Sequence, residues 1–570
     1  MSKANSKTLG IDLSEDRLLA IAADYIDDHN YIGALRMLNK NAELNGNAED
    51  SYMLYAEAYD DMGLYEKSIN GWFKYIDYSY GYPDSDFTDA YEGLAVNYLN
   101  MGEEELSAFY YNKLLVETAA ELTPDNRQEI INNFIVSRKS PLKIAWPPRL
   151  ADYSGEMERG ISYMRAGDFE NAVAEFEKVD EGNKSYLSAR NYIAMCDIIA
   201  DKCDEAEQEC LAVLKKYPDD VQALTTLAAV KNQQKKGEES RALAQRLLSV
   251  NASGTDDLYK IATVCCENGM HADAYALFCK IEEDLPYDNS VLYFKAVSAY
   301  NSGHKRESLD AFDKIQTIYS DAVTAKYYSD VVRTHLAEND EDYKTNPLTY
   351  FYRLPQEERE SNIEILSAFV RLKDKHAKAI SEEIDITDCI RWCFDEGGDH
   401  GSVELKMLGA ACAVKAAYCD DLLRDILLDA FLPDSLKMQT LGFIAERNES
   451  CSYGVVVCHV YRKVDIPALS VGRNKKKVFV KAYAMTVARF GLIEPEHVHS
   501  LNSSAAALYE QLARAKALAE IKNAPALAAV IYANSGINEG TPDADAACAF
   551  FSADRKKFDY ILSLVTEPGE

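Results

Sequence analysis

Glycine and proline are scarce in this 570-residue sequence, with 27 and 15 residues respectively. This scarcity disfavours a loop-rich all-β protein and excludes a collagen-like one. The N-terminal residues lack an apolar segment followed by a small-residue cleavage site, and no run of eighteen apolar residues occurs. We therefore expect neither a secretory signal nor a membrane span, and we expect a cytoplasmic protein.

Paired cysteine motifs and catalytic signatures are also absent. None of the 13 cysteines forms a CxxC pair, which favours buried thiols in a reducing compartment. The sequence contains no GxGxxG, GxxxxGK(S/T), HExxH or GxSxG motif, and its nine histidines are dispersed. We therefore expect no catalytic activity, no cofactor and no metal site.

Basic residues are in deficit, with 61 bases against 93 acids and a net charge of −32. A general nucleic-acid binder usually has the opposite balance. The acidity is confined to residues 1–440, because residues 441–570 carry 15 bases and 14 acids. An acidic surface therefore accompanies the N-terminal three quarters of the chain, and the C-terminal region is neutral.

A 34-residue period is the strongest positive signal in the sequence. A small residue recurs at this spacing in two runs: Ala22 and Ala56, then Gly160, Ala194, Ala228, Ala262 and Ala296. A second small residue, a turn glycine and a bulky residue four positions after the second small residue keep the same phase. Small residues let two helices cross closely, and glycine ends a helix with a positive φ. One helix pair cannot bury its apolar face alone, so the pairs must stack.

This pattern resembles the tetratricopeptide repeat family over about residues 15–318, where eight repeats fit. The resemblance implies an all-α fold, an α-solenoid of eight helix pairs followed by a further helical region. The repeats are interrupted by an expected loop at 78–87 and by the proline-containing stretch 140–148, which cannot be helical throughout. In the sixth repeat the glycine is displaced to Gly237, so a longer turn is expected there.

The interruptions divide the chain into five expected regions. Residues 1–115 hold three repeats, 116–150 a helix and a hinge, 151–318 five repeats, 319–466 a weakly HEAT-like helical region, and 467–570 further helices. Within the last region, 543–551 and 554–565 resemble a degenerate helix-turn-helix in outline. The β-branched segment 454–461 fits either a strand or a buried helix, and periodicity does not decide between them.

The resemblance implies that the first helices of the repeats line a concave groove. None of the thirty-two positions assigned to that groove is lysine or arginine, which argues against a clamp for acidic peptides. In the first block the groove positions include six acids: Asp16, Asp50, Glu57, Asp60, Asp89 and Glu92. In the second block they include Met157, Met164, Met195, Tyr259, Tyr293 and Tyr300. These residues fit basic and apolar protein segments respectively, or they pack inside a tightly wound superhelix.

Two functions are consistent with these features. The first is a non-catalytic scaffold or adaptor that binds basic or apolar protein segments in the groove. The second is a regulator whose C-terminal region contacts nucleic acid through a basic cluster. The cluster comprises Arg473, Lys475, Lys476, Lys477 and Lys481, and its alternative interpretation is a solvated helix start or loop. We expect a protein or peptide partner in either case, and no membrane.

Overall fold

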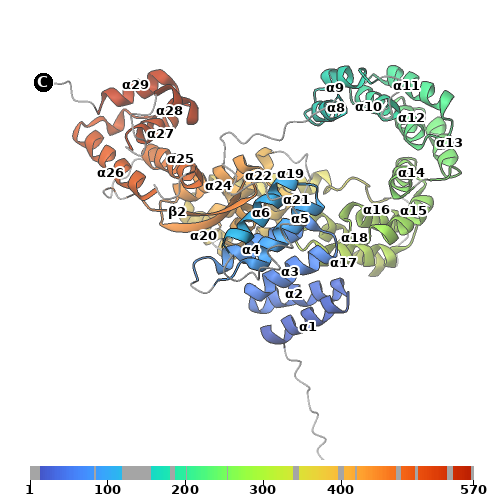
Figure 1. Cartoon of the computed structure of the whole chain (residues 1–570), viewed down its shortest axis with the longest axis horizontal. Helices are drawn as coiled ribbons and strands as arrows, with labels where there is room; N and C mark the ends of the chain where they lie inside the picture. Colours follow the sequence, from blue (N-terminus) through green and yellow to red (C-terminus); the bar gives the residue numbers. More distant parts are fainter. Residues whose placement is uncertain are drawn as a thin grey trace, which may run out of the picture. The chain divides into compact units, whose positions relative to one another are not determined.

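The computed structural model describes residues 13–82, 85–117, 156–179, 186–200, 202–252, 254–337, 346–395, 403–416, 420–469, 471, 477–493, 498–535 and 544–565. The chain divides into two compact units. Arg149–Leu354 form one unit, and Met1–Pro148 together with Pro355–Glu570 form the other. Helices dominate the described parts of both units (Figure 1).

The first block consists of three helix pairs. They are α1 (Glu15–Asp27) with α2 (Tyr31–Asn45), α3 (Glu49–Asp61) with α4 (Tyr65–Ser79), and α5 (Thr88–Asn100) with α6 (Glu104–Glu117). The small residues Ala22, Ala56 and Ala95 at the helix crossings are fully buried. The crossing between α3 and α4 is so close that a Cβ added to Gly71 would lie 2.9 Å from the Ala56 Cβ. The loop expected at 78–87 separates α4 from α5, and the predicted hinge at 116–150 lies almost wholly outside the described residues.

The second block contains five more pairs, which follow one another along a curved row (Figure 1). They are α8 (Glu156–Arg165) and α9 (Phe169–Phe176), α10 (Tyr186–Ile199) and α11 (Cys203–Lys216), α12 (Val221–Gln233) and α13 (Gly237–Leu247), α14 (Thr255–Glu267) and α15 (His271–Asp284), and α16 (Asn289–Asn301) and α17 (Lys305–Ile318). A further helix, α18 (Val323–Ala337), packs on α17. The predicted α-solenoid of eight helix pairs between residues 15 and 318 is confirmed.

The turns inside the pairs explain the glycine pattern. Gly63 and Gly303 have φ angles of 72° and 92°, in the left-handed region that glycine tolerates best. The sixth repeat differs from our expectation of a longer turn. Three residues separate α12 from α13, as in the other turns, and Lys235 takes the left-handed conformation with φ 60°. The prediction was wrong because a non-glycine residue accepts the strained position, and Gly237 instead opens α13.

Helices continue after the solenoid, and one β-hairpin interrupts them. The helices are α19 (Gln356–Arg371), α20 (Asp374–Glu383), α21 (Thr387–Asp395), α22 (Val403–Lys415), α23 (Asp420–Leu428), α24 (Asp434–Glu446), α25 (Lys477–Ile493), α26 (Val498–Arg514), α27 (Ala524–Ala533), α28 (Ala544–Phe550) and α29 (Arg555–Ser563). The hairpin pairs β1 (Cys451–Val457) with β2 (Val460–Ile466). Segment 454–461 is therefore strand and turn. Cys458 and His459 both have positive φ, as a tight hairpin turn requires.

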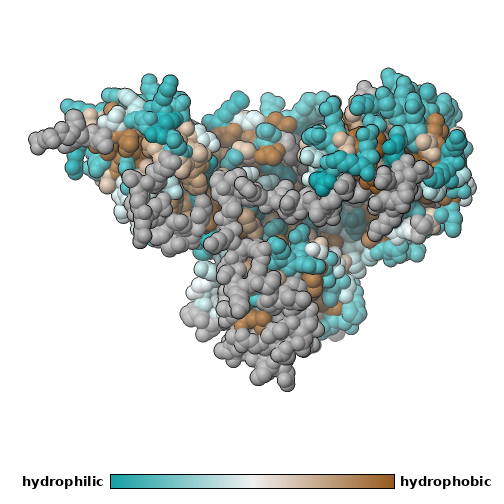
Figure 2. Space-filling model, turned by 45° about the horizontal axis from the view of Figure 1, so that its top comes forward, coloured by the Kyte–Doolittle hydropathy of each residue, from teal (hydrophilic) through white to brown (hydrophobic). Residues whose placement is uncertain are grey.

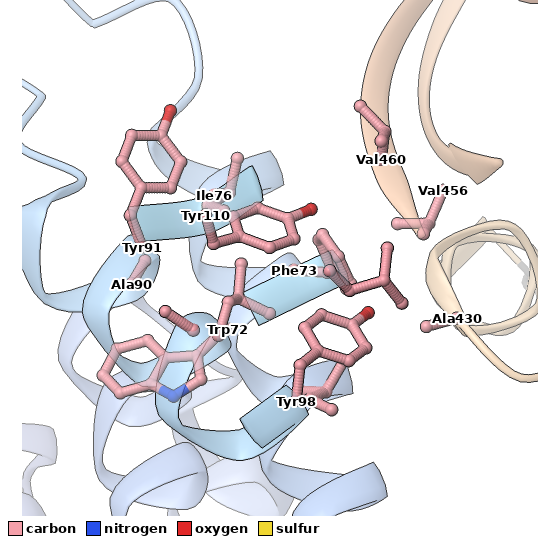
Figure 3. Packing of buried hydrophobic residues seen from close by; sticks show 14 of the residues in the cluster. Trp72, Phe73, Ile76, Ala90, Tyr91, Tyr98, Tyr110, Ala430, Val456 and Val460 are labelled. Carbon is pink, nitrogen blue, oxygen red and sulfur yellow. The ribbon is translucent and has the colours of Figure 1, made fainter. Parts of the chain in front are cut away.

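The hairpin shares a hydrophobic core with the first block. Buried Trp72 and Phe73 of α4, with Tyr98 and Tyr110 of the third pair, belong to the same cluster as Val456 and Val460, which flank the hairpin turn. Figure 3 shows Phe73, Tyr98 and Tyr110 on the side of the cluster that faces the hairpin and Ala430, whereas Trp72 and Tyr91 lie farther from them. The first and last parts of the sequence thus fold together into one unit, an arrangement that the five expected regions did not indicate.

Candidate functional site

Six carboxylates form one candidate site, which we call the acidic face: Asp16, Asp50, Glu57, Asp60, Asp89 and Glu92. They lie on α1, α3 and α5, the first helices of the three pairs. Four of them are exposed, whereas Glu57 and Asp60 are half-buried. None of the six has a basic ion-pair partner within the described ranges. The predicted residues therefore lie on consecutive first helices and carry uncompensated negative charge.

The two half-buried acids of this face are electrostatically strained. Burial raises the pKa of the Glu57 carboxyl, and the nearby acids Asp89, Asp61 and Asp27 raise it further. Burial likewise raises the pKa of Asp60, with a contribution from Asp61. Both shifts mean that the ionised forms are disfavoured here. A bound cation would relieve this penalty, because it stabilises the ionised carboxylates.

The second block carries a cavity at its fifth to seventh pairs. It has a volume of about 460 Å³. Met195 lines it, together with three further positions that the resemblance assigned to the groove: Ser188, Asn191 and Gln222. The cavity also reaches Asp257 and Lys260 of α14, so its lining is more polar than the predicted methionines suggested. The part of Figure 2 that this block forms, at the right, is likewise coloured mainly hydrophilic.

The other predicted residues of the second block differ in accessibility. Met164 is half-buried and packs against the core of α9 and α10, whereas the side chain of Met157 lies outside the described residues. Tyr259 is half-buried, with its ring edge-on to Phe278 and Phe294. Tyr293 and Tyr300 are fully buried. These two tyrosines are therefore not accessible to a partner in this structure, whereas we expected them to contact one directly.

Tyr293 is buried because segment 346–354 of the same chain packs over it. The Tyr293 hydroxyl lies 3.0 Å from the Thr349 carbonyl oxygen and 3.1 Å from that of Phe351. The Asn301 side chain donates to the Leu348 carbonyl at 2.9 Å and accepts from the Leu348 amide at 2.7 Å. Tyr300, by contrast, hydrogen-bonds to His335 of α18 at 2.5 Å. The sequence contained no period or motif that indicated this segment.

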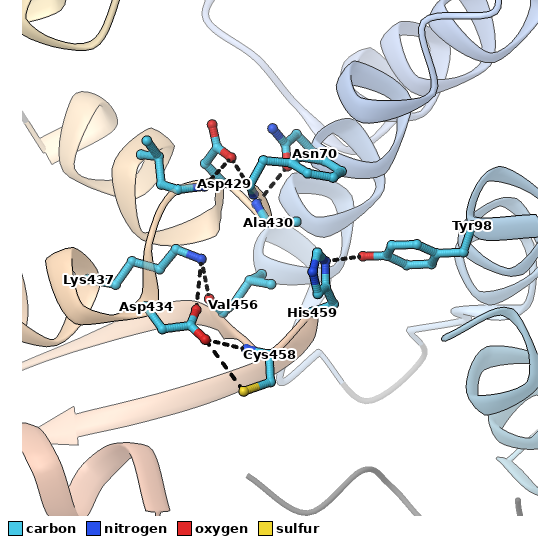
Figure 4. Close-up of polar contacts among 11 residues, drawn as sticks. Asn70, Tyr98, Asp429, Ala430, Asp434, Lys437, Val456, Cys458 and His459 are labelled. Carbon is cyan, nitrogen blue, oxygen red and sulfur yellow. Dashed lines mark hydrogen bonds and ion pairs between the residues drawn. The ribbon is translucent and has the colours of Figure 1, made fainter. Parts of the chain in front are cut away.

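The hairpin turn makes a second intramolecular contact, on the first block (Figure 4). The Tyr110 hydroxyl donates to the His459 carbonyl at 2.6 Å, and the Tyr98 hydroxyl lies 3.1 Å from His459 Nδ1. Behind the turn, the fully buried Lys437 donates to the Val456 carbonyl at 2.7 Å and lies 3.4 Å from Asp434. The contacts of Tyr98 and Tyr110 fix the hairpin turn on α5 and α6, and Lys437 fixes β1 on α24.

The C-terminal basic cluster is only partly described. Lys477 and Lys481 are exposed on α25, whereas Arg473, Lys475 and Lys476 lie outside the described residues. In the helix-turn-helix candidate, Asp554 caps α29 by accepting from the Lys557 amide at 3.0 Å. Arg555 forms ion pairs with Asp545 and Asp559. Its charge is therefore engaged within the candidate motif.

The geometry defines an α-solenoid of tetratricopeptide type with a helical C-terminal region. No protein-family model matches the sequence, and no curated protein matches it significantly. Among solved structures, the chain is similar to a tetratricopeptide repeat protein from Parabacteroides merdae, with 16% identity, a TM-score of 0.23 and coverage of 50% of this chain and 98% of the other. It is also similar to the Cut9–Hcn1 structure from the APC/C, with 11% identity, a TM-score of 0.25 and coverage of 98% and 97%. The chain's own helix pairs, and not these remote likenesses, establish the repeat architecture.

Within the described part of the chain, none of the helices combines the length and the apolar character needed to cross a membrane.

Proposed function

We propose that the protein is a non-catalytic scaffold that binds a basic protein segment on the acidic face of its first block. The observation that supports this function is the set of six acids on three consecutive first helices, without basic partners among the described residues. Attraction between this face and a basic segment raises the association rate, and salt screens it. In the second block, we propose that the groove binds a protein segment with apolar side chains.

The acidic face is tested by reversing charge at four positions: Asp50→Lys, Glu57→Lys, Asp60→Lys and Glu92→Lys in one chain. The probe is a fluorescent lysine- and arginine-rich peptide, and the readout is its anisotropy at low and at high salt. We expect the variant to bind about tenfold more weakly or worse at low salt. A pull-down from nuclease-treated lysate with both proteins then identifies the natural partner.

A matched control separates the face from the overall charge of the protein. The variant Glu283→Lys, Asp310→Lys, Glu382→Lys and Glu510→Lys changes the net charge equally at exposed positions outside the acidic face. We expect this control to bind the peptide nearly as well as the natural chain. An equal loss of binding in both variants would show that the peptide senses only net charge, and the acidic face would then have no specific role.

A further inference from the structure

The segment 346–354 is held mainly through its backbone. Two atoms of the Asn301 side chain engage the amide and the carbonyl of Leu348, and the contact is fully buried. Tyr293 contacts two further carbonyl oxygens, and the Tyr328 hydroxyl donates to the Arg353 carbonyl at 2.9 Å. Backbone amides and carbonyls occur in every peptide. The segment is not extended, because residues 350–353 form consecutive bends and the Arg353 amide donates to the Phe351 carbonyl at 2.7 Å. The groove therefore holds a bent, non-helical backbone, and side chains must supply any selectivity.

Three side chains of the segment supply that selectivity. Leu348 and Leu354 are buried, with 9% and 5% of their surfaces exposed. The ring of Tyr350 stacks on His271 and Phe294, and its hydroxyl lies 2.8 Å from His271 Nδ1. Phe351, in contrast, is 68% exposed. The preferred ligand therefore has an apolar residue, an aromatic residue two positions later and a second apolar residue four positions after that.

The occupied part of the groove and the open cavity both involve α14. Tyr350 packs against a hydrophobic cluster whose residues come from α12 to α16, and the cavity is lined by Asp257 and Lys260 of α14.

We propose that α14 to α18 form a binding site for a bent, non-helical peptide of this apolar–aromatic–apolar pattern, and that segment 346–354 is its resident ligand. A partner segment of the same chemistry binds by displacing the resident one. This inference rests on the proposed binding role of the second-block groove. Because the resident segment is covalently attached, its effective concentration is high, and it weakens the apparent affinity of any competing peptide.

The test uses the full chain and a labelled peptide with the sequence of residues 346–354. In a released variant, Leu348→Asp and Tyr350→Asp remove the two side chains that anchor the resident segment. We expect this variant to bind the peptide at least about tenfold more tightly than the natural chain. Adding Asn301→Ala to the released variant should reverse the gain. Phe351→Asp is the control, since it places one of the two added charges in the segment at an exposed position and should leave peptide binding unchanged.

Equal affinity of the released variant and the natural chain, or no binding by either, overturns the inference. Hydrogen exchange provides a second measurement that does not depend on the folding of a variant. Excess peptide added to the natural chain should accelerate exchange of the Leu348 amide, and unchanged exchange overturns displacement. The lysine- and arginine-rich peptide is measured on the same proteins. The proposed function assigns its binding to the first block, so a failure of the acidic face and a failure of this inference give different results.

Discussion

Gly454 of β1 lies where a strand approaches a buried carboxylate of the first block. A Cβ added to Gly454 would lie 2.1 Å from Asp77 Oδ1 and 2.6 Å from Cε2 of Tyr461. The same Asp77 oxygen accepts from the Tyr461 hydroxyl at 2.8 Å and from the Lys463 ammonium at 3.0 Å. The side chain of Asp77 is only 7% exposed, so it has little room to move. Gly454→Ala therefore forces Asp77 away from both donors.

The cost of this substitution follows from what Asp77 loses. A hydrogen bond to a charged group contributes about 1.5–3 kcal/mol, and overpacking a filled site costs about 1–3 kcal/mol. The Lys463 contribution is discounted because its side chain is 28% exposed. We expect the hairpin to lose about 2–4 kcal/mol of local stability. Since each 1.4 kcal/mol is a factor of ten, its amides should exchange roughly 30- to 1,000-fold faster.

Hydrogen exchange of residues 451–466, followed by mass spectrometry in the full chain, measures this effect locally. The matched control is Gly442→Ala in α24, where an added Cβ meets nothing within 4 Å. Alanine in a helix interior is favoured over glycine by about 0.5–1 kcal/mol, so this control should not accelerate exchange. In an Asp77→Ala background the clash with the carboxylate is absent, and Gly454→Ala should then cost much less. Strictly additive costs of the two substitutions would refute the reasoning.

Two further predictions concern the acidic face and the turn of the sixth pair. The pKa values of Glu57 and Asp60 are raised, mainly by burial, so these carboxylates become protonated at a higher pH than ordinary carboxyls do. Affinity for a basic peptide should therefore begin to fall at that higher pH as the solution is acidified. Anisotropy titrations of the natural chain and of Glu57→Gln with Asp60→Asn check this, and an identical pH profile would contradict it. Lys235→Gly should stabilise the second block by about 0.5–1 kcal/mol, because glycine adopts φ 60° without steric cost. Denaturant unfolding with Lys236→Gly as control measures it, and no gain would contradict the strained turn.

The solenoid could be predicted from the sequence because each of its signals is local. Ala228 and Ala262 are 34 positions apart and fully buried, since every pair repeats the same helix crossing. Glycine at a turn is a sufficient signal but not a necessary one, as Lys235 shows. The acidic positions of the first block came from the family resemblance, which assigns groove positions by their offset from the small residue, and the structure places Asp50, Glu57 and Asp60 on the first helix of one pair.

The two intramolecular contacts could not be predicted, since they join residues distant in sequence. Tyr98 and His459 are 361 positions apart, and neither belongs to a motif whose spacing indicates the other. Asn301 and Leu348 are 47 positions apart, and Asn301 binds the backbone of Leu348. Every residue has the same backbone groups, so the sequence gives no indication of this contact. The available signals were weak ones. They were the β-branched run at 454–461 and the aromatic residues at 350–352, both of which lie outside the 34-residue repeat pattern.

The hairpin also bears on the kind of partner that the first block can accept. Its apolar contacts with Phe73, Tyr98 and Tyr110 already cover hydrophobic surface of α4 to α6. The positions that remain exposed on the first helices include Asp16, Asp50, Asp89 and Glu92. Under the function that we propose, a partner of this surface is recognised chiefly through charge, which favours fast, salt-sensitive association over long residence. Strong salt dependence of the first-block interaction, together with weak salt dependence of peptide binding at α14 to α18, follows directly from this division.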